Sequence, residues 1–315
     1  MKKILFLVSN RVHLARQQKL LNLLKEKSEL FVEEVRINQS NDEGDFEAKK
    51  DLRAAECYLA AGNFITKYDP DIVLVRGDRF EMLPVAMVAS YRGKTVAHIE
   101  GGDKSGAIDN KVRHAISQLA DIHFPTNDDA VKRLKKMGIP AKHIHQVGSL
   151  DVELAHELPK EEPKEEYILV LHHEIKGEMG SYREVEQAVQ GYSYKKIYVK
   201  SNNDYATTTG EQEFSPEKFL QLLYGAKCAV GNSSSFIKEA GIMGTPVVLV
   251  GNRQDGRVRT RNIIDTIPRD REITREIGLQ LIAGRYDPDL TYYGEKTAEK
   301  IVDILTQDYN KKTVF

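Results

Sequence analysis

Short apolar runs alternate along the chain with longer segments in which apolar residues recur every three or four positions. The first cycle is an apolar run at residues 4–8, followed by a leucine-rich segment that ends near Lys25. Short continuous apolar runs are typical of buried parallel strands, and the longer spacing is typical of amphipathic helices. The pattern therefore predicts a β-α-β-α succession, which builds parallel sheets covered by helices.

The same alternation continues through the rest of the sequence. It predicts further strands at residues 30–35, 72–75, 95–99, 122–124, 167–171, 197–199, 228–230 and 246–250. It predicts helices at residues 49–67, 80–91, 109–119, 214–224, 236–243 and 297–305, and another that opens at Asn127-Asp128. No strand follows the last helix, which makes it a candidate to pack back on the first domain.

A chain of 315 residues is longer than one hydrophobic core normally supports. The densely charged run at residues 159–166, with prolines at both Pro159 and Pro163, is the best candidate for a linker. We therefore predict two Rossmann-like, doubly wound α/β domains with a cleft between them, at residues 1–158 and 167–290, and a C-terminal helix within residues 291–315. Such a cleft suits a ligand with two unlike ends.

Composition narrows the possible partners. The chain is 41% apolar and 30% charged, which is typical of a globular protein, and its net charge of -1 gives no basic field for nucleic acid or an anionic membrane. The first apolar run is too short for a signal peptide, and no run approaches the ~20 residues of a membrane span. Cys57 and Cys228 lie far apart without metal-type spacing. We expect a cytoplasmic protein with free thiols that binds neither nucleic acid nor membrane.

Acidic residues gather where strands of the first half end. Asp78 and Glu81 follow the strand at residues 72–75, Glu100 and Asp103 follow the strand at 95–99, and Asp109 opens the next helix. Each acid alone could cap a helix or lie on the surface. Together they mark the carboxyl edge of a parallel sheet, where α/β proteins bind their ligands.

The sequence does not assign a single role to each histidine. His98 is either a hydrogen-bonded core residue or part of the site, and His114 is expected to face inward in a structural or a substrate-binding role. His143 and His145 are expected on the surface, because no partner stands at metal-ligand spacing, so we predict no metal site.

A second constellation lies in the other half of the chain. Gly231-Asn232-Ser233-Ser234-Ser235 follows a strand and opens a helix that carries Glu239. Backbone N–H groups, small hydroxyls and the helix dipole can bind an anion there, although serines also simply cap helices. Arg253, just past the next strand, is placed to bind a diphosphate bidentately. Neither a Walker lysine motif nor Gly-x-Gly-x-x-Gly is present, which argues against P-loop and dinucleotide folds.

These two constellations resemble the hydrolysing UDP-N-acetylglucosamine 2-epimerases of the sialic acid pathway. The matching segments, in chain order, are Arg76-Gly77-Asp78-Arg79-Phe80-Glu81, His98-Ile99-Glu100-Gly101-Gly102, Ser105-Gly106-Ala107-Ile108-Asp109, Arg113-His114-Ala115-Ile116 and Gly231-Asn232-Ser233-Ser234. Non-hydrolysing relatives typically carry His-Val-Glu-Ala-Gly-Leu-Arg and Gly-Asp-Thr at these places, which fits this chain less well.

The resemblance implies a glycosyltransferase-B-like fold that holds UDP mainly in its C-terminal domain, no cofactor, and a homo-oligomer, either a dimer or a tetramer. It implies anti-elimination of UDP to a 2-acetamidoglucal and hydration to free N-acetylmannosamine. The implied catalytic acids are Asp78, Glu100 and Asp109. The implied contacts to nucleotide or sugar are Arg11, Arg79, His173, Ser233, Ser234, Glu239 and Arg253.

The chain also departs from the family pattern. It lacks the aspartate that normally follows two residues after Arg11, Asp103 replaces a glutamate, Glu174 replaces the proline after His173, and the segment between residues 171 and 214 is shorter. The sugar, the nucleotide base and the identity of the base catalyst stay open, and Asp109 could instead cap its helix. The alternatives are a non-hydrolysing epimerase, a glycosyltransferase of the same fold, and a sugar-nucleotide binder without turnover.

Overall fold

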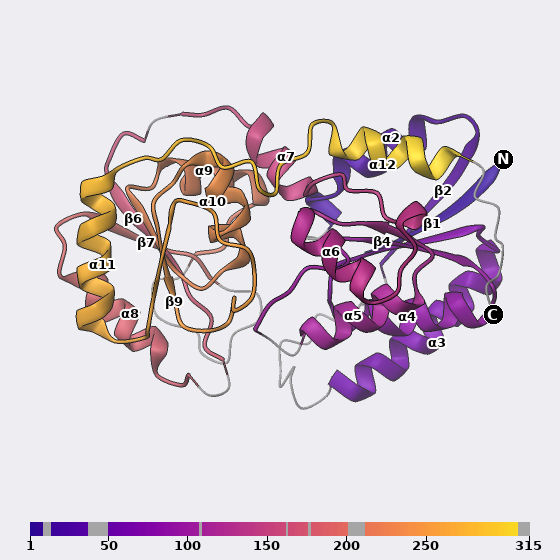
Figure 1. The fold of residues 1–315 in the computed structure, drawn as a ribbon, viewed down its shortest axis with the longest axis horizontal. Helices are drawn as coiled ribbons and strands as arrows, with labels where there is room; N and C mark the ends of the chain where they lie inside the picture. The colour runs from indigo at the N-terminus through magenta and orange to yellow at the C-terminus, as the bar shows by residue number, and fades with distance from the viewer. Residues whose placement is uncertain are drawn as a thin grey trace. The chain divides into compact units, whose positions relative to one another are not determined.

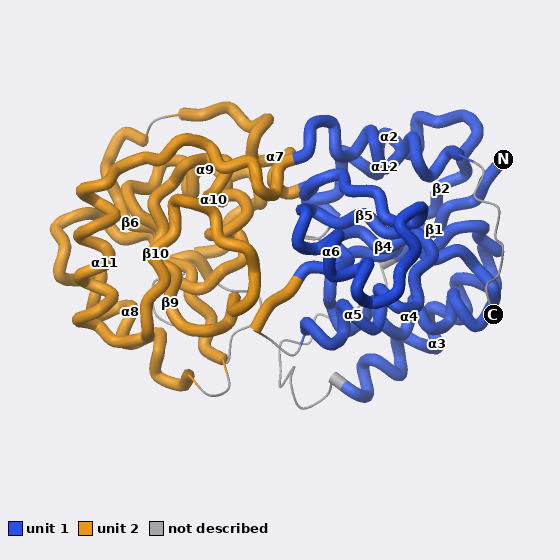
Figure 2. Tube along the Cα trace, in the orientation of Figure 1, with its two compact units in different colours: residues 1–103, 108–150, 294–315 blue, residues 104–107, 151–293 orange. Residues whose placement is uncertain are grey.

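Each half of the chain folds around its own parallel β-sheet in the computed structural model, which describes residues 1–8, 14–36, 50–106, 109–161, 163–175, 178–200 and 212–307. The chain divides into two units, coloured separately in Figure 2. Unit 1 contains Met1–Asp103, Ile108–Leu150 and Gly294–Phe315, and unit 2 contains Lys104–Ala107 and Asp151–Tyr293.

The sheet of unit 1 has the strand order β2-β1-β3-β4-β5, and all neighbouring strands are parallel. Every residue of β3 and β4 is buried. A strand covered on both faces needs mostly apolar side chains at successive positions, which is why these segments are mostly apolar; Arg76 ends β3, and β4 contains the buried Thr95 and His98. The strands are β1 (Lys2–Val8), β2 (Leu30–Arg36), β3 (Ile72–Arg76), β4 (Thr95–Ile99) and β5 (Ile122–Phe124).

Helices cover both faces of this sheet (Figure 1). Alternate residues of β1 divide between the two layers: Ile4 and Phe6 pack with α2 and α12, whereas Leu5 and Leu7 pack with α3 and α4. The helices are α2 (Gln18–Glu26), α3 (Lys50–Tyr68), α4 (Met82–Tyr91), α5 (Asp109–Leu119), α6 (Asp128–Lys136) and α12 (Thr297–Thr306), with a 3-10 turn η1 (Ala141–His143).

Unit 2 repeats this architecture with the strand order β10-β9-β8-β6-β7, again all parallel. The strands are β6 (Tyr167–Leu171), β7 (Lys195–Tyr198), β8 (Cys228–Gly231), β9 (Val247–Val250) and β10 (Ile263–Thr266). Helices α7 (Leu150–Glu157), α9 (Pro216–Gly225) and α10 (Lys238–Met243) pack on one face, and α8 (Ser181–Gln190) and α11 (Asp270–Ala283) on the other.

The predicted linker at residues 159–166 is wrong. Val152 and Ala155 of α7 are fully buried in the core of unit 2, so the chain leaves unit 1 already at Leu150. The charged run is a surface loop within unit 2, where Glu165 and Glu166 form ion pairs with lysines of the same unit. Charge and proline mark an exposed loop equally well whether or not it joins two domains.

Helix α12 completes the core of unit 1. Its residues Ala298, Ile301, Val302 and Leu305 are buried in the same cluster as the leucines of α2. At its first residue, the Thr297 hydroxyl donates to the Val147 carbonyl oxygen at 2.8 Å. The last helix in the described part of the chain therefore belongs to the first unit.

We expect the substitution Ile301→Ala to lower the free energy of unfolding by about 2–5 kcal/mol, because it removes buried methyl groups and leaves a cavity between α12 and the sheet. Urea unfolding followed by far-UV circular dichroism measures the change. The exposed neighbour Lys300 gives a matched control, since Lys300→Ala should change stability by less than about 0.5 kcal/mol. Equal, small effects of both substitutions would contradict this role of α12.

Both cysteines are buried free thiols, Cys57 in unit 1 and Cys228 in unit 2. Burial raises the pKa of Cys57 to about 11 and that of Cys228 to about 12. Across the described part of the chain, no helix combines the length and the apolar character that a membrane crossing requires.

Candidate active site

Glu100 stands directly after β4 in an unusual backbone conformation. Its φ of 63° lies in the left-handed region, which costs a residue other than glycine about 1–3 kcal/mol unless its surroundings hold it there. Its N–H donates to the Phe124 carbonyl oxygen at 2.9 Å. Its carboxylate Oε1 accepts from Arg76 Nη2 at 2.8 Å and from the Ser149 hydroxyl at 3.2 Å. Backbone and side chain are thus both fixed.

The partner Arg76 is the last residue of β3 and pairs in register with Ile99, the residue before Glu100. The Arg76 and Glu100 side chains are only 9% and 12% exposed. A buried ion pair of this kind is costly to break, because removing one partner leaves the other charge uncompensated.

Asp78 lies in the turn after β3 and is held by another buried arginine. Arg113 of α5 contacts the Asp78 carboxylate through Nη2 and donates through Nη1 to the Asp103 carbonyl oxygen at 3.2 Å. Asp103 itself accepts from the Thr126 hydroxyl at 3.0 Å. Asp78 and Glu100 therefore follow neighbouring strands of one sheet, each as the carboxylate of an arginine ion pair.

Arg79 is held by Glu81, with Nε and Nη2 donating to the two carboxylate oxygens at 3.2 and 2.9 Å. The Glu81 carboxylate is fully buried, whereas the Arg79 side chain is 17% exposed. This two-point contact fixes the plane of the guanidinium.

His98 is a hydrogen-bonded core histidine, the first of the two roles that the sequence left open. Burial lowers its pKa to about 4, so the ring is neutral near pH 7. Nε2 lies 2.8 Å from the Gly77 carbonyl oxygen and Nδ1 lies 3.1 Å from the Ser117 hydroxyl. Because a carbonyl only accepts, Nε2 carries the proton and Nδ1 accepts from Ser117. His98 thus supports the turn that carries Asp78.

In unit 2, the chain leaves β8 through Gly231, whose φ is 145°. A Cβ at this position would collide with the Leu171 carbonyl oxygen, so the close approach of β6 and β8 requires glycine. Ser233 then caps the 3-10 turn η2 (Ser234–Phe236) by accepting from the Ser235 N–H at 3.3 Å. The predicted helix at residues 236–243 is wrong at its start, because the serines open a 3-10 turn and α10 begins only at Lys238.

Asn232 was not among the predicted site residues, yet it joins three segments of unit 2. Its side chain accepts from the His173 N–H and donates to the His173 carbonyl oxygen, both at 2.8 Å. Its own carbonyl oxygen accepts from Arg253 Nη1 and from Gln254 Nε2, both at 3.0 Å.

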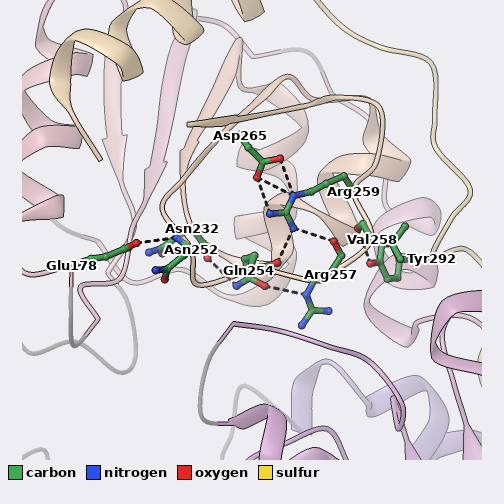
Figure 3. A network of polar contacts seen from close by, with 9 residues as sticks. All are labelled: Glu178, Asn232, Asn252, Gln254, Arg257, Val258, Arg259, Asp265 and Tyr292. Atoms are coloured by element: carbon green, nitrogen blue, oxygen red, sulfur yellow. Dashed lines mark hydrogen bonds and ion pairs between the residues drawn. The ribbon is translucent and has the colours of Figure 1, made fainter. Parts of the chain in front are cut away.

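The loop that carries Arg253 is fixed by a network of polar contacts (Figure 3). Gln254 accepts from Arg257 Nε at 3.0 Å through its side chain and from Arg259 Nη1 at 2.7 Å through its carbonyl. Arg259 is in turn paired with Asp265 of β10. At one end of the loop Glu178 accepts from the Asn252 N–H, and beyond Arg257 the Tyr292 hydroxyl donates to the Val258 carbonyl oxygen.

A family model described as UDP-N-acetylglucosamine 2-epimerase matches residues 13–306 of this chain. The chain belongs to this family. The UDP-N-acetylglucosamine 2-epimerase of Neisseria meningitidis serogroup B is 35% identical over 271 residues, covering 75% of this chain and 72% of that protein. The protein of Legionella pneumophila named UDP-N,N'-diacetylbacillosamine 2-epimerase (hydrolyzing) is 32% identical over 275 residues, covering 75% and 71%.

Solved structures of 2-epimerases share the fold. The structure of the Methanocaldococcus jannaschii UDP-GlcNAc 2-epimerase in complex with UDP-GlcNAc and UDP superimposes with a TM-score of 0.78 at 18% identity, covering 97% of this chain and 99% of that one. The predicted fold class, two Rossmann-like parallel-sheet domains of the glycosyltransferase-B type, is confirmed.

For the other predicted residues of this 2-epimerase family member, the structure gives the position in the fold. Asp109 is the first residue of α5, the helix that carries Arg113, and an acid there interacts favourably with the helix dipole. Glu239 is buried in α10. Arg11 lies outside the described residues. His143 and His145 are half-buried rather than exposed, and no metal-binding group of three acidic, histidine or cysteine side chains occurs among the described residues.

Proposed function

We propose that this protein is a hydrolysing 2-epimerase that converts a UDP-N-acetylhexosamine, in the first place UDP-N-acetylglucosamine, to UDP and the free 2-epimer, N-acetylmannosamine. The observation that carries the proposal is the pair of acids after neighbouring strands, Asp78 and Glu100, each held by a buried arginine. The Legionella relative, named a hydrolyzing epimerase, supports the same branch of the family.

The chemistry needs negative charge near the sugar. Breaking the anomeric C–O bond puts positive charge on the ring and leaves both bonding electrons on the departing diphosphate. Asp78, Glu100 and Asp109 are proposed to stabilise that positive charge, and one of them takes the proton from C2 to form the 2-acetamidoglucal. Water then adds its hydroxyl to C1, and a proton returns to C2 on the opposite face. The sum is one water consumed and UDP released.

The two acids are held in fixed orientations, Glu100 by Arg76 and Asp78 by Arg113, so little reorganisation accompanies the reaction.

The nucleotide is assigned to residues of unit 2. Arg253 is proposed to bind the diphosphate together with Ser233 and Ser234, and Glu239 to accept hydrogen bonds from the ribose. Charge-assisted contacts of this kind contribute about 1.5–3 kcal/mol each. The remaining contacts to phosphate or sugar are proposed for Arg11, Arg79 and His173.

The names of two relatives indicate alternative reactions and substrates that the test must include. The Neisseria relative is named without the word hydrolyzing, which favours testing for a product that keeps its nucleotide. The Legionella relative is named for a diamino sugar, so UDP-N,N'-diacetylbacillosamine is the second substrate to test. We also propose that the protein is a homo-oligomer, a dimer or a tetramer, which light scattering after gel filtration would measure.

The deciding experiment is incubation of the pure protein with each UDP-sugar in deuterated water, followed by proton and phosphorus NMR. We expect UDP and a free 2-epimeric sugar that carries solvent deuterium at C2. An epimerised product that retains UDP would show the non-hydrolysing reaction instead. UDP release that requires an added acceptor would show a transferase, and calorimetric UDP binding without any product would show a binding protein.

A further inference from the structure

We infer that Asn232 is a positioning residue: it fixes the two ligand-binding groups His173 and Arg253, which lie on different loops, and does not itself touch the ligand. The inference rests on the proposed function, because it assigns a task within the proposed UDP site. Asn232 is 1% exposed, whereas His173 and Arg253 are both only half-buried.

The side chain of Asn232 extends the pairing of β6 with β8 beyond the end of both strands. The last paired residues are Leu171 and Gly231, and the Asn232 N–H still donates to the Leu171 carbonyl oxygen at 3.2 Å. Beyond this point the side-chain amide takes the place of a peptide group. It satisfies both the N–H and the C=O of His173 at 2.8 Å.

The side chain of Asn232 makes both bonds to His173 because an amide carries a donor and an acceptor on one carbon. Asparagine and glutamine have such a group, whereas aspartate has two acceptors. The His173 backbone is therefore held by a feature that is specific to an amide at residue 232.

The main chain of Asn232 fixes the second group. Its carbonyl oxygen accepts from Arg253 Nη1 and Gln254 Nε2 at 3.0 Å each. Gln254 lies next to Arg257 and Arg259 in the network of Figure 3, so the carbonyl is anchored to a loop that is itself fixed. One residue thus sets the relative positions of the loop after β6 and the loop after β9.

The location agrees with a role in binding. The segments that contain His173, Asn232 and Arg253 follow β6, β8 and β9, at the carboxyl edge of the sheet of unit 2. This edge is where open α/β sheets bind ligands. A second buried asparagine, Asn262, precedes β10 at the opposite edge, where its Nδ2 donates to the Thr245 carbonyl oxygen at 2.6 Å. It provides a matched control for loss of a buried amide.

The test compares Asn232→Ala, Asn232→Asp and the control Asn262→Ala by UDP calorimetry and by kcat and KM of the proposed reaction. Asn232→Ala should weaken UDP binding about ten-fold or more, because both hydrogen bonds that hold the His173 backbone are lost. Asn232→Asp should be at least as damaging, because a carboxylate oxygen would face the His173 carbonyl. Asn232→Asp keeps the shape of the side chain and the bond from the His173 N–H. It therefore replaces Asn232→Ala in the binding measurement if the alanine variant does not fold. Asn262→Ala should lower stability yet leave the UDP dissociation constant within about two-fold.

Double-mutant cycles separate positioning from a merely structural role. In the background His173→Ala, a further change at Asn232 should cost UDP affinity much less than it does in the wild type. In the background Arg253→Ala the cost should persist, because Arg253 is held by the main-chain carbonyl that every substitution at residue 232 keeps. An equal cost in the His173→Ala background and in the wild type, with normal binding by the wild type, would overturn the inference alone. A wild-type protein that neither binds UDP nor releases it from any UDP-sugar would overturn the proposed function, and this inference with it.

Discussion

Replacing Glu100 by glutamine is expected to lower kcat about 10²–10⁴-fold, the range typical for loss of a general base, while UDP affinity stays within about three-fold. Glutamine keeps the shape of the side chain and an oxygen that can accept from Arg76 and Ser149. It cannot take a proton from C2 or carry the negative charge that the ring requires. Release of UDP measures kcat, and calorimetry measures UDP binding.

Two further variants show whether the loss is chemical. Glu100→Ala leaves the buried Arg76 without its partner and should destabilise the protein by about 3–5 kcal/mol, whereas Glu100→Gln should cost much less. Glu276→Gln changes another buried, arginine-paired carboxylate, on α11 of unit 2, and should leave kcat within about two-fold. A large loss of UDP binding in Glu100→Gln would show that this residue contacts the nucleotide and that its assignment to the sugar is wrong.

The strands that the sequence predicted best are those buried on both faces. The bounds of β4, β6 and α5 agree with the predicted ranges, because both strands are mostly apolar segments between polar turns and the helix begins at an acid. The order of the strands could not be read from these runs, since it depends on which neighbours each strand meets after folding.

The elements that escaped prediction, β10, α7, α8 and α11, lack a clear apolar pattern in the sequence. The edge strand β10 has a single neighbouring strand and includes Asp265 and Thr266, so it shows no apolar run. Helix α11 exposes Ile282 and half-exposes Leu279, which blurs its apolar stripe. Helix α7 was missed because its buried Val152 and Ala155 are small and stand among charged residues.

The acids of the candidate site could be proposed from the sequence, but their hydrogen-bond and ion-pair partners could not. Glu100 and Arg76 are separated by 24 residues, and only the parallel register of β3 and β4 brings them together. Asn232 and His173 are separated by 59 residues and meet only because β6 and β8 are neighbours. The state of His98 likewise depends on the Gly77 carbonyl and Ser117, which no local pattern connects to it.

Acidification should destabilise unit 1 strongly, because two histidines are buried there without charge. Burial lowers the pKa of His98 to about 4 and that of His123, in the middle of β5, to about 3, against 6.5 for an ordinary histidine. The unfolded chain therefore gains protons below pH 6.5 that the folded protein does not. Each histidine lowers the free energy of unfolding by about 1.4 kcal/mol for each pH unit below 6.5. The two together should therefore lower it by about 5 kcal/mol between pH 6.5 and 4.5. Urea unfolding at several pH values measures this loss.

The substitution His123→Leu isolates one of the two contributions. It removes the group whose protonation favours the unfolded state, so the variant should lose about 2–3 kcal/mol less than the wild type over the same two pH units. The comparison cancels the carboxylates, which titrate in both proteins alike. An unchanged pH dependence in His123→Leu would mean that the folded protein admits the proton as readily as the unfolded chain does. In that case the ring would have to reach water or an acidic partner, contrary to its burial in the strand next to the one that carries Glu100.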